Sequence, residues 1–263
     1  MGHRHQPLSG NRRRRRPRAR GPCGLAGLLL LVPCLASAGS VSGQVVFRGE
    51  VPVPAPIAAL KDRGVCGERV PAEGLVVARG TLGVQQAVVF LEGVGAVQGP
   101  PPGEAKLENR GCRFVPHVLA VRVGTELLIT NADPVLHNLH AWLMPEHRSI
   151  MNVVQPTQGQ ETRRTVRRPG VMAITCDSHV HMLAHLLAFE HPYFALTDGT
   201  GAFRISGIPP GTYRLTAWHE GWRVVRTEPE GRPVYEAPYL LSQDVVIPES
   251  GEARLTLELA PRP

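Results

Sequence analysis

One cysteine and its neighbours constrain this chain more than any other feature. Cys176 is followed by His179 and Met182 at intervals of three residues, and His137 lies well before them. A thiolate, two imidazoles and a thioether in this order are the ligands of a mononuclear blue copper site, in which a trigonal His2Cys plane has a long axial Met. Such a site requires a fold that carries His137, from a distant segment, to the loop that holds the other three donors.

The choice of ligands within this loop has alternatives. His181 competes in reach with His179, but Cys-x2-His is the spacing that the trigonal plane requires, so His179 is the predicted ligand. Met182 is the predicted axial ligand, and its alternative role is that of a methionine filling space in the core. A loop this rich in histidine could instead hold zinc at a structural site.

The positive charge of the chain is concentrated at its start. The net charge is +7, but eight arginines and no acidic residue precede residue 39, which leaves 21 basic against 22 acidic residues. The sequence therefore does not predict nucleic-acid binding. The arginines, the apolar run 25–35 and the sequence Ala-Ser-Ala at 36–38 predict a signal peptide over residues 1–38 and hence a periplasmic or secreted protein. A lipoprotein anchored through Cys34 is a minor alternative, and no later segment is apolar enough to cross a membrane.

Removal of this leader would leave three cysteines, Cys66, Cys112 and Cys176. An odd number of cysteines in an oxidising compartment requires an explanation. A disulfide between Cys66 and Cys112 would leave Cys176 as the free thiol that a metal can hold as a thiolate.

Short runs rich in β-branched residues, separated by Gly, Pro, Asn and Asp, predict an all-β fold of the sandwich or barrel type. These runs are residues 44–47, 86–91, 118–123, 126–130 and 171–175. After residue 192 the turn sequences at 198–201 and 209–211 predict hairpins. No long stretch shows sustained helical periodicity with capping residues.

The segment 131–140 and the Cys-x2-His-x2-Met loop resemble those of the cupredoxins, most closely the amicyanin and plastocyanin-like branch. Together with the stretch that begins at His191, they also resemble the bacterial family labelled methylamine utilisation proteins. This resemblance implies a cupredoxin-like Greek-key β-sandwich, with copper held by the four ligands named above. It also implies that Asn138 hydrogen-bonds across to the cysteine loop. The chain departs from the pattern at Val180 and His181, where amicyanin-like loops usually carry a proline and an aromatic residue.

The stretch after residue 192 resembles the small transthyretin-like sandwich of carboxypeptidase regulatory domains. We therefore expect, after the leader, N-terminal strands and loops over 39–80, a cupredoxin-like copper domain over 81–192 and a carboxypeptidase regulatory-like sandwich over 193–263. Residues 41–49 are a candidate strand to complete that last sandwich, which would make the copper domain an insertion in it.

The predicted function is that of an exported copper protein, not an enzyme, that carries single electrons between periplasmic redox proteins. The expected electron port is an exposed edge of His179, ringed by Val180 and Leu183. A copper-storage module is the first alternative, because His140, His181 and His185 are surplus to the predicted site. A structural zinc site is the second. A cysteine hydrolase is not predicted, because no orienting carboxylate lies at a recognisable spacing.

The histidines outside the predicted ligand set are interpreted as structural residues. His117 is expected to be structural, and His185 and His191 are expected to be plain strand residues. His219 is expected to pack beside Trp218 or to hydrogen-bond locally, and His140 is expected at a strand end on the surface.

Overall fold

The computed structural model describes residues 38–97 and 102–262, and its regular structure is almost entirely β-strand. Among these residues α1 (Arg63–Cys66) is the one helix. The prediction of an all-β fold is confirmed. The predicted leader lies outside the described residues, apart from its last position. Within the described part of the chain, no helix has the length and apolar character needed to span a membrane.

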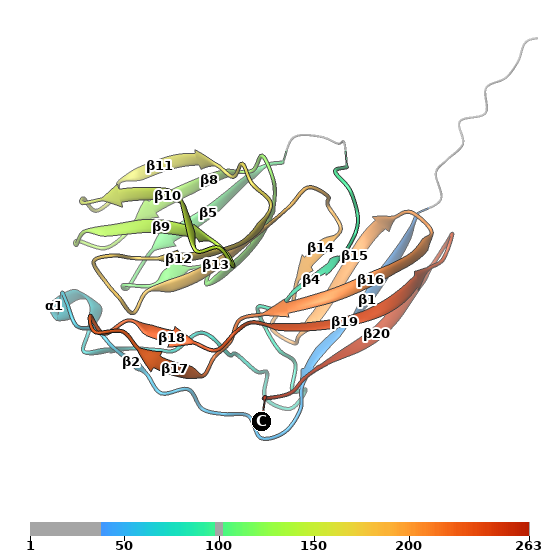
Figure 1. Cartoon of the computed structure of the whole chain (residues 1–263), viewed down its shortest axis with the longest axis horizontal. Coiled ribbons are helices and arrows are strands. Elements are labelled where there is room, and N and C mark those ends of the chain that lie inside the picture. Colours follow the sequence, from blue (N-terminus) through green and yellow to red (C-terminus); the bar gives the residue numbers. More distant parts are fainter. Residues whose placement is uncertain (1–37, 98–101, 263) are drawn as a thin grey trace, which may run out of the picture. The chain divides into compact units, whose positions relative to one another are not determined.

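Two sheets that pack face to face form a first sandwich (Figure 1). One sheet has the strand order β10-β9-β12-β13-β7 and the other β11-β8-β5-β6. Their strands are β5 (Glu104–Asn109), β6 (Phe114–Val115), β7 (Val118–Arg122), β8 (Glu126–Asn131), β9 (His137–Leu143), β10 (Arg148–Gln155), β11 (Glu161–Thr165), β12 (Gly170–Thr175) and β13 (Leu183–Phe189). Alternate residues of a strand face the same side, so Leu127 and Ile129 of β8 meet Met172 and Ile174 of β12 in one buried core.

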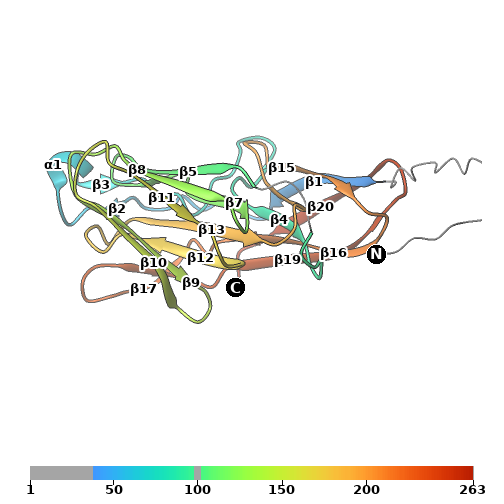
Figure 2. The ribbon, with the colours of Figure 1, turned by 90° about the horizontal axis from the view of Figure 1, so that it is seen from above.

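A second sandwich combines strands from both ends of the described chain. Its sheets have the orders β15-β1-β20 and β14-β4-β16-β19. Their strands are β1 (Gly39–Phe47), β4 (Val88–Leu91), β14 (Phe194–Leu196), β15 (Ala202–Ile208), β16 (Gly211–His219), β19 (Tyr239–Ile247) and β20 (Glu252–Leu259). Because β1 pairs with both β15 and β20, it lies between two strands that come more than 150 residues later (Figure 2).

The strand pairing differs from the expected domain boundary at residue 81. β4 pairs with β14 and β16 and so belongs to the second sandwich. Val89 and Leu91 are buried in the core of that sandwich, whereas Val88 packs with Val118 and Leu187 of the first sandwich. β4 is therefore apolar on both faces, and from its sequence it is indistinguishable from a strand of the first sandwich.

Residues 48–80 form an arm with little regular structure, made of β2 (Ile57–Ala58), α1 and β3 (Arg69–Val70). Cys66, the last residue of α1, forms a disulfide with Cys112, which lies between β5 and β6 of the first sandwich. This bond joins the arm to the sandwich that carries the predicted ligands.

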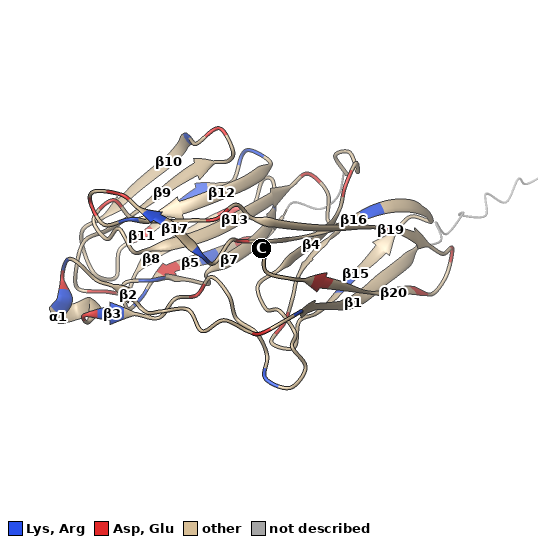
Figure 3. Ribbon diagram, turned by 60° about the horizontal axis from the view of Figure 1, so that its bottom comes forward, with Lys and Arg blue, Asp and Glu red and all other residues tan. Residues whose placement is uncertain are grey.

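Two further strands, β17 (Val224–Thr227) and β18 (Pro233–Tyr235), form a hairpin after β16. Figure 3 shows basic and acidic residues interspersed over the described strands and turns. This mixture agrees with the near-zero net charge of the chain beyond its first 38 residues.

We predict that replacing both Cys66 and Cys112 with serine lowers the midpoint of thermal unfolding. The disulfide closes a loop of 46 residues, and restriction of the unfolded chain by such a loop is worth about 4 kcal/mol in the chain-entropy account. Differential scanning calorimetry of the variant against the parent protein measures the change. An unchanged midpoint, or free thiols at both positions in the parent protein by mass spectrometry, would contradict this prediction.

Candidate metal centre

The predicted ligands come from two adjacent strands of the five-stranded sheet. His137 is the first residue of β9, and Cys176 directly follows β12. These strands are antiparallel, with His140 opposite Thr175, so the start of β9 and the end of β12 lie at one edge. His179 and Met182 lie in the short loop that leads from Cys176 into β13.

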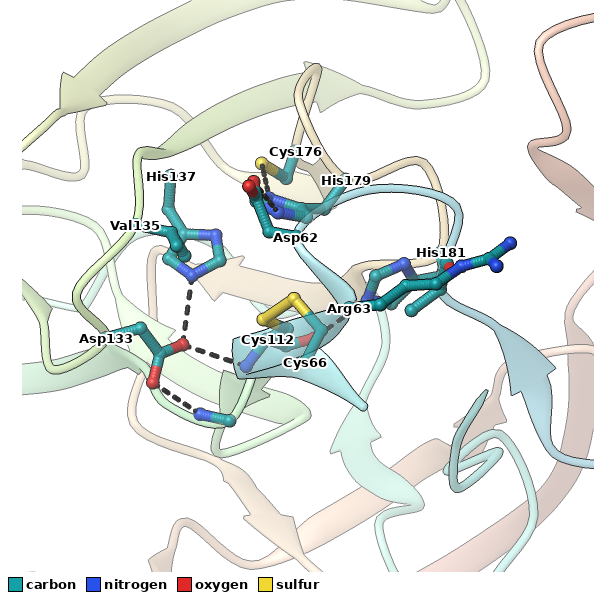
Figure 4. Close-up of a disulfide and its surroundings, with 12 residues drawn as sticks. Asp62, Arg63, Cys66, Cys112, Asp133, Val135, His137, Cys176, His179 and His181 are labelled. Carbon is teal, nitrogen blue, oxygen red and sulfur yellow. Dashed lines mark hydrogen bonds and ion pairs between the residues drawn. A yellow bond between two sulfur atoms is a disulfide. The ribbon is translucent and has the colours of Figure 1, made fainter. Parts of the chain in front are cut away.

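The structure brings His137, Cys176 and His179 together. One potential ligand atom from each lies within 4.8 Å of those from the other two (Figure 4). Cys176 and His137 are fully buried, and His179 is 1% exposed. Polar groups buried this deeply almost always have hydrogen-bond partners. A buried nitrogen or sulfur atom without a partner therefore indicates a position that a ligand could occupy.

Each imidazole is held by a carboxylate on the side away from the cysteine. Nε2 of His137 is 2.9 Å from Oδ2 of Asp133, and Nε2 of His179 is 3.0 Å from Oδ2 of Asp62. The remaining nitrogens are both Nδ1. That of His137 has no hydrogen-bond partner, and that of His179 is 3.7 Å from the sulfur of Cys176. A carboxylate behind a metal-binding imidazole fixes its tautomer and raises its basicity.

The Asp133 carboxylate is itself fixed by backbone groups. It accepts hydrogen bonds from the N–H groups of Gly111 and Cys112, each at 2.8 Å. Asn131 shapes the same loop, because its Oδ1 accepts the N–H of Asp133 and its Nδ2 donates to the carbonyl of Val135. The loop before His137 is therefore held at both ends.

Asn138 joins the start of β9, next to His137, to the cysteine loop. Its Oδ1 accepts the backbone N–H of Asp177 at 2.7 Å and lies 3.3 Å from the Cys176 sulfur. Its Nδ2 donates to the Asp177 carboxylate, and its own backbone N–H points to the same sulfur at 3.5 Å. These bonds restrict the position of the sulfur relative to His137.

Burial dominates the acid–base properties of the three side chains. It raises the pKa of the Cys176 thiol above its ordinary value, and it lowers the pKa of His137 and of His179. Neutral imidazoles are the form that binds a metal, whereas the thiol must lose its proton. A positive ion at this position would supply the charge that favours the thiolate.

His181 takes a different position from His179. Its Nε2 lies 3.1 Å from the carbonyl oxygen of Cys112, to which the ring donates. Among the described residues, the His/Cys/Asp/Glu cluster that contains Cys176 includes His179 and not His181. Met182 is 2% exposed and packs in the same core cluster as Cys176, and its backbone N–H closes a turn onto the carbonyl of His179. Its role as axial ligand stays a prediction.

The expected exposed edge of His179 is absent, and this expectation was wrong. Asp62, which immediately precedes α1, covers the ring with its carboxylate, and the disulfide at Cys66 ties α1 down nearby (Figure 4). Arg232 adds to the cover by donating to the carbonyls of Cys176 and Val180. The pair Cys66 and Cys112 was the one sequence signal for this cover, because a bond between them brings the arm to the first sandwich.

Comparison with known proteins gives partial matches. Residues 175–228 match a family model described as polysaccharide lyase family 4, domain II. A search of the curated proteins finds no match. Similar solved structures include a copper-containing nitrite reductase from Thermus scotoductus SA-01 (24% identity, 38% of this chain and 24% of that chain, TM-score 0.28) and a purple cupredoxin from Nitrosopumilus maritimus (21%, 32% and 99%, 0.28). Another is the P52G mutant of amicyanin in its Cu(I) form (14% identity, 38% of this chain and 98% of that chain, TM-score 0.29). These TM-scores are all far below 0.5.

We predict that the Cys176 thiol of the native, metal-free protein is protected from thiol reagents. The sulfur is fully buried and its pKa is raised by burial, so both access and the thiolate fraction are reduced. Its reaction with a disulfide reagent should be slower than in the guanidinium-unfolded protein by roughly tenfold or more. Equal rates in the two states would contradict the buried position.

Proposed function

We propose that this protein binds one copper ion through His137, Cys176 and His179, with the Met182 thioether as axial ligand, and that it carries single electrons between periplasmic redox proteins. The proposal rests on the buried cluster of His137, Cys176 and His179, in which the Nδ1 of His137 has no partner and the Nδ1 of His179 is 3.7 Å from the sulfur. A thiolate with two imidazoles is the donor set that suits both oxidation states of copper.

Copper at this position would supply the one-electron redox chemistry, and the chain would supply its geometry and electrostatics. The side chain and the backbone N–H of Asn138 hold the sulfur, and Asn138 is itself fixed by the Asp177 N–H, so the donor atoms are positioned before binding. Asp133 and Asp62 orient the two imidazoles and place negative charge one ring away from the ion. Such fixed donors limit the rearrangement that accompanies a change of charge.

The surplus histidines give less support to copper storage than the sequence suggested. His140 lies between Asp177 and Ser149, with its Nε2 2.8 Å from the serine hydroxyl. His181 is bonded to a backbone carbonyl, and His185 faces Glu220. A different observation keeps storage as the second candidate: the buried ring of His179 lacks the exposed edge that an electron carrier would present to a partner.

We predict that the purified protein loaded with Cu(II) is intensely blue and that the Cys176→Ser variant is colourless. The colour arises from the thiolate bound to copper, so it is lost with the sulfur. His140→Ala is the matched control, because this histidine lies on β9 three residues from His137 and outside the cluster; it should remain blue. Absorption and electron-paramagnetic-resonance spectra provide the measurement. A wild-type protein that holds one copper without colour would refute the proposed ligand set.

The rate of electron exchange distinguishes an electron carrier from a copper-storage protein. We predict that the copper-loaded wild type exchanges electrons with a small redox partner in stopped-flow experiments and that Asp62→Ala exchanges faster, because the variant uncovers His179. Glu68→Ala is the control: it removes the same charge from an exposed residue of the same arm. Slow exchange in all three proteins would favour storage.

A further inference from the structure

A second group of metal-binding side chains lies outside the site described above. His117 precedes β7, His185 lies on β13, and Glu220 directly follows β16. One potential ligand atom from each lies within 4.8 Å of those from the other two. The two histidines belong to the first sandwich and Glu220 follows a strand of the second.

The spacing suits a shared ion. Nδ1 of His185 is 3.4 Å from Oε2 of Glu220, and two ligands bound tetrahedrally at about 2.1 Å from one metal lie about 3.4 Å apart. Nε2 of His117 hydrogen-bonds the other carboxylate oxygen, Oε1. The backbone N–H of His185 donates to the carbonyl of His117, so the parallel pairing of β13 with β7 fixes the backbone positions from which the two rings extend.

Burial leaves polar atoms of this cluster without partners. Glu220 is 4% exposed, His117 is 7% exposed and the side chain of His185 is 12% exposed. Nδ1 of His117 lies 4.0 Å from a Glu73 carboxylate oxygen and Nδ1 of His185 lies 3.4 Å from Glu220, but neither nitrogen makes a hydrogen bond. A buried carboxylate and unsatisfied imidazole nitrogens are costly unless another group binds them.

There is also room for a further ligand. A cavity of about 20 Å³ on one side of this cluster is lined by His117, Glu220 and Glu73, though not by His185, and it also reaches Met182. This volume is enough for one water molecule. Three protein ligands with a water in the fourth position is the arrangement of open zinc sites that have a His2Glu ligand set.

We propose that His117, His185 and Glu220 form a second metal site, which takes a divalent transition-metal ion of the zinc type with a water as fourth ligand. His117 and His185, interpreted from the sequence as structural residues, then share an ion with a carboxylate from the second sandwich. This proposal does not depend on copper at the first site. Its competitor is a metal-free buried cluster held by hydrogen bonds and charge alone.

Metal counting on copper-loaded protein tests the proposal. The protein is equilibrated with Zn(II), passed through a desalting column, and both metals are measured per chain by mass spectrometry. We expect one zinc in addition to copper. Glu220→Gln and His185→Ala should lower the zinc affinity by roughly 100-fold or more while the copper colour is kept. His140→Ala, a histidine outside this cluster, should keep both metals.

Two further measurements test whether a loss of zinc reflects misfolding of a variant and whether zinc binds at the first site instead. Zn(II) should raise the unfolding midpoint of the copper-loaded wild type, and a chelator should reverse the rise. Cys176→Ser should still bind zinc in a way that depends on Glu220. Absence of zinc from the wild type, no shift of its midpoint, or zinc lost through Cys176→Ser but retained in Glu220→Gln would each overturn the second site.

Discussion

The antiparallel pairing of β9 with β12 is the constraint on which the candidate metal centre depends. It places His137 and Cys176 at one sheet edge through backbone hydrogen bonds, without any contribution from a metal. The register is set by the side chains beneath, because Ala141 of β9 and Ile174 of β12 are buried in the same core. A slip of one residue would turn these apolar groups outward, so the core that stabilises the sandwich also aligns the donors.

The arm then converts an open sheet edge into a closed site. Asp62 meets His179 across 117 residues of sequence, and the Cys66–Cys112 disulfide holds the neighbouring helix in place. In this region the Nδ1 of His137 is buried without a partner, and an unsatisfied buried polar group costs about 1–3 kcal/mol. A bound ion would remove this cost, and the carboxylates that orient the rings would strengthen its binding. The same closure separates His179 from any partner protein.

The features that could be predicted from the sequence are those that depend on local patterns of residues. The all-β fold followed from short apolar runs and turn residues, and the nearness of His137, Cys176 and His179 followed from donor types and spacing. Asp62 and Glu220 were missed because single acidic residues carry no spacing signal, and their partners lie more than 100 residues away. β4 was assigned to the wrong neighbours for a related reason: a strand buried on both faces looks the same in either sandwich.

β13 shows why the two clusters lie near each other. Its alternate residues Ala184 and Leu186 face the core of the first sandwich, whereas Leu187 packs with Trp218 of the second. His185 lies on that second face, with its ring centroid 5.1 Å from that of Trp218. Met182 immediately precedes the same strand. One strand therefore connects the loop of the first site to a histidine of the second cluster, and the packing of Trp218 against it brings in Glu220, two residues further along the chain. The contact between the sandwiches thus places a carboxylate beside histidines that the first sandwich alone would leave unpaired.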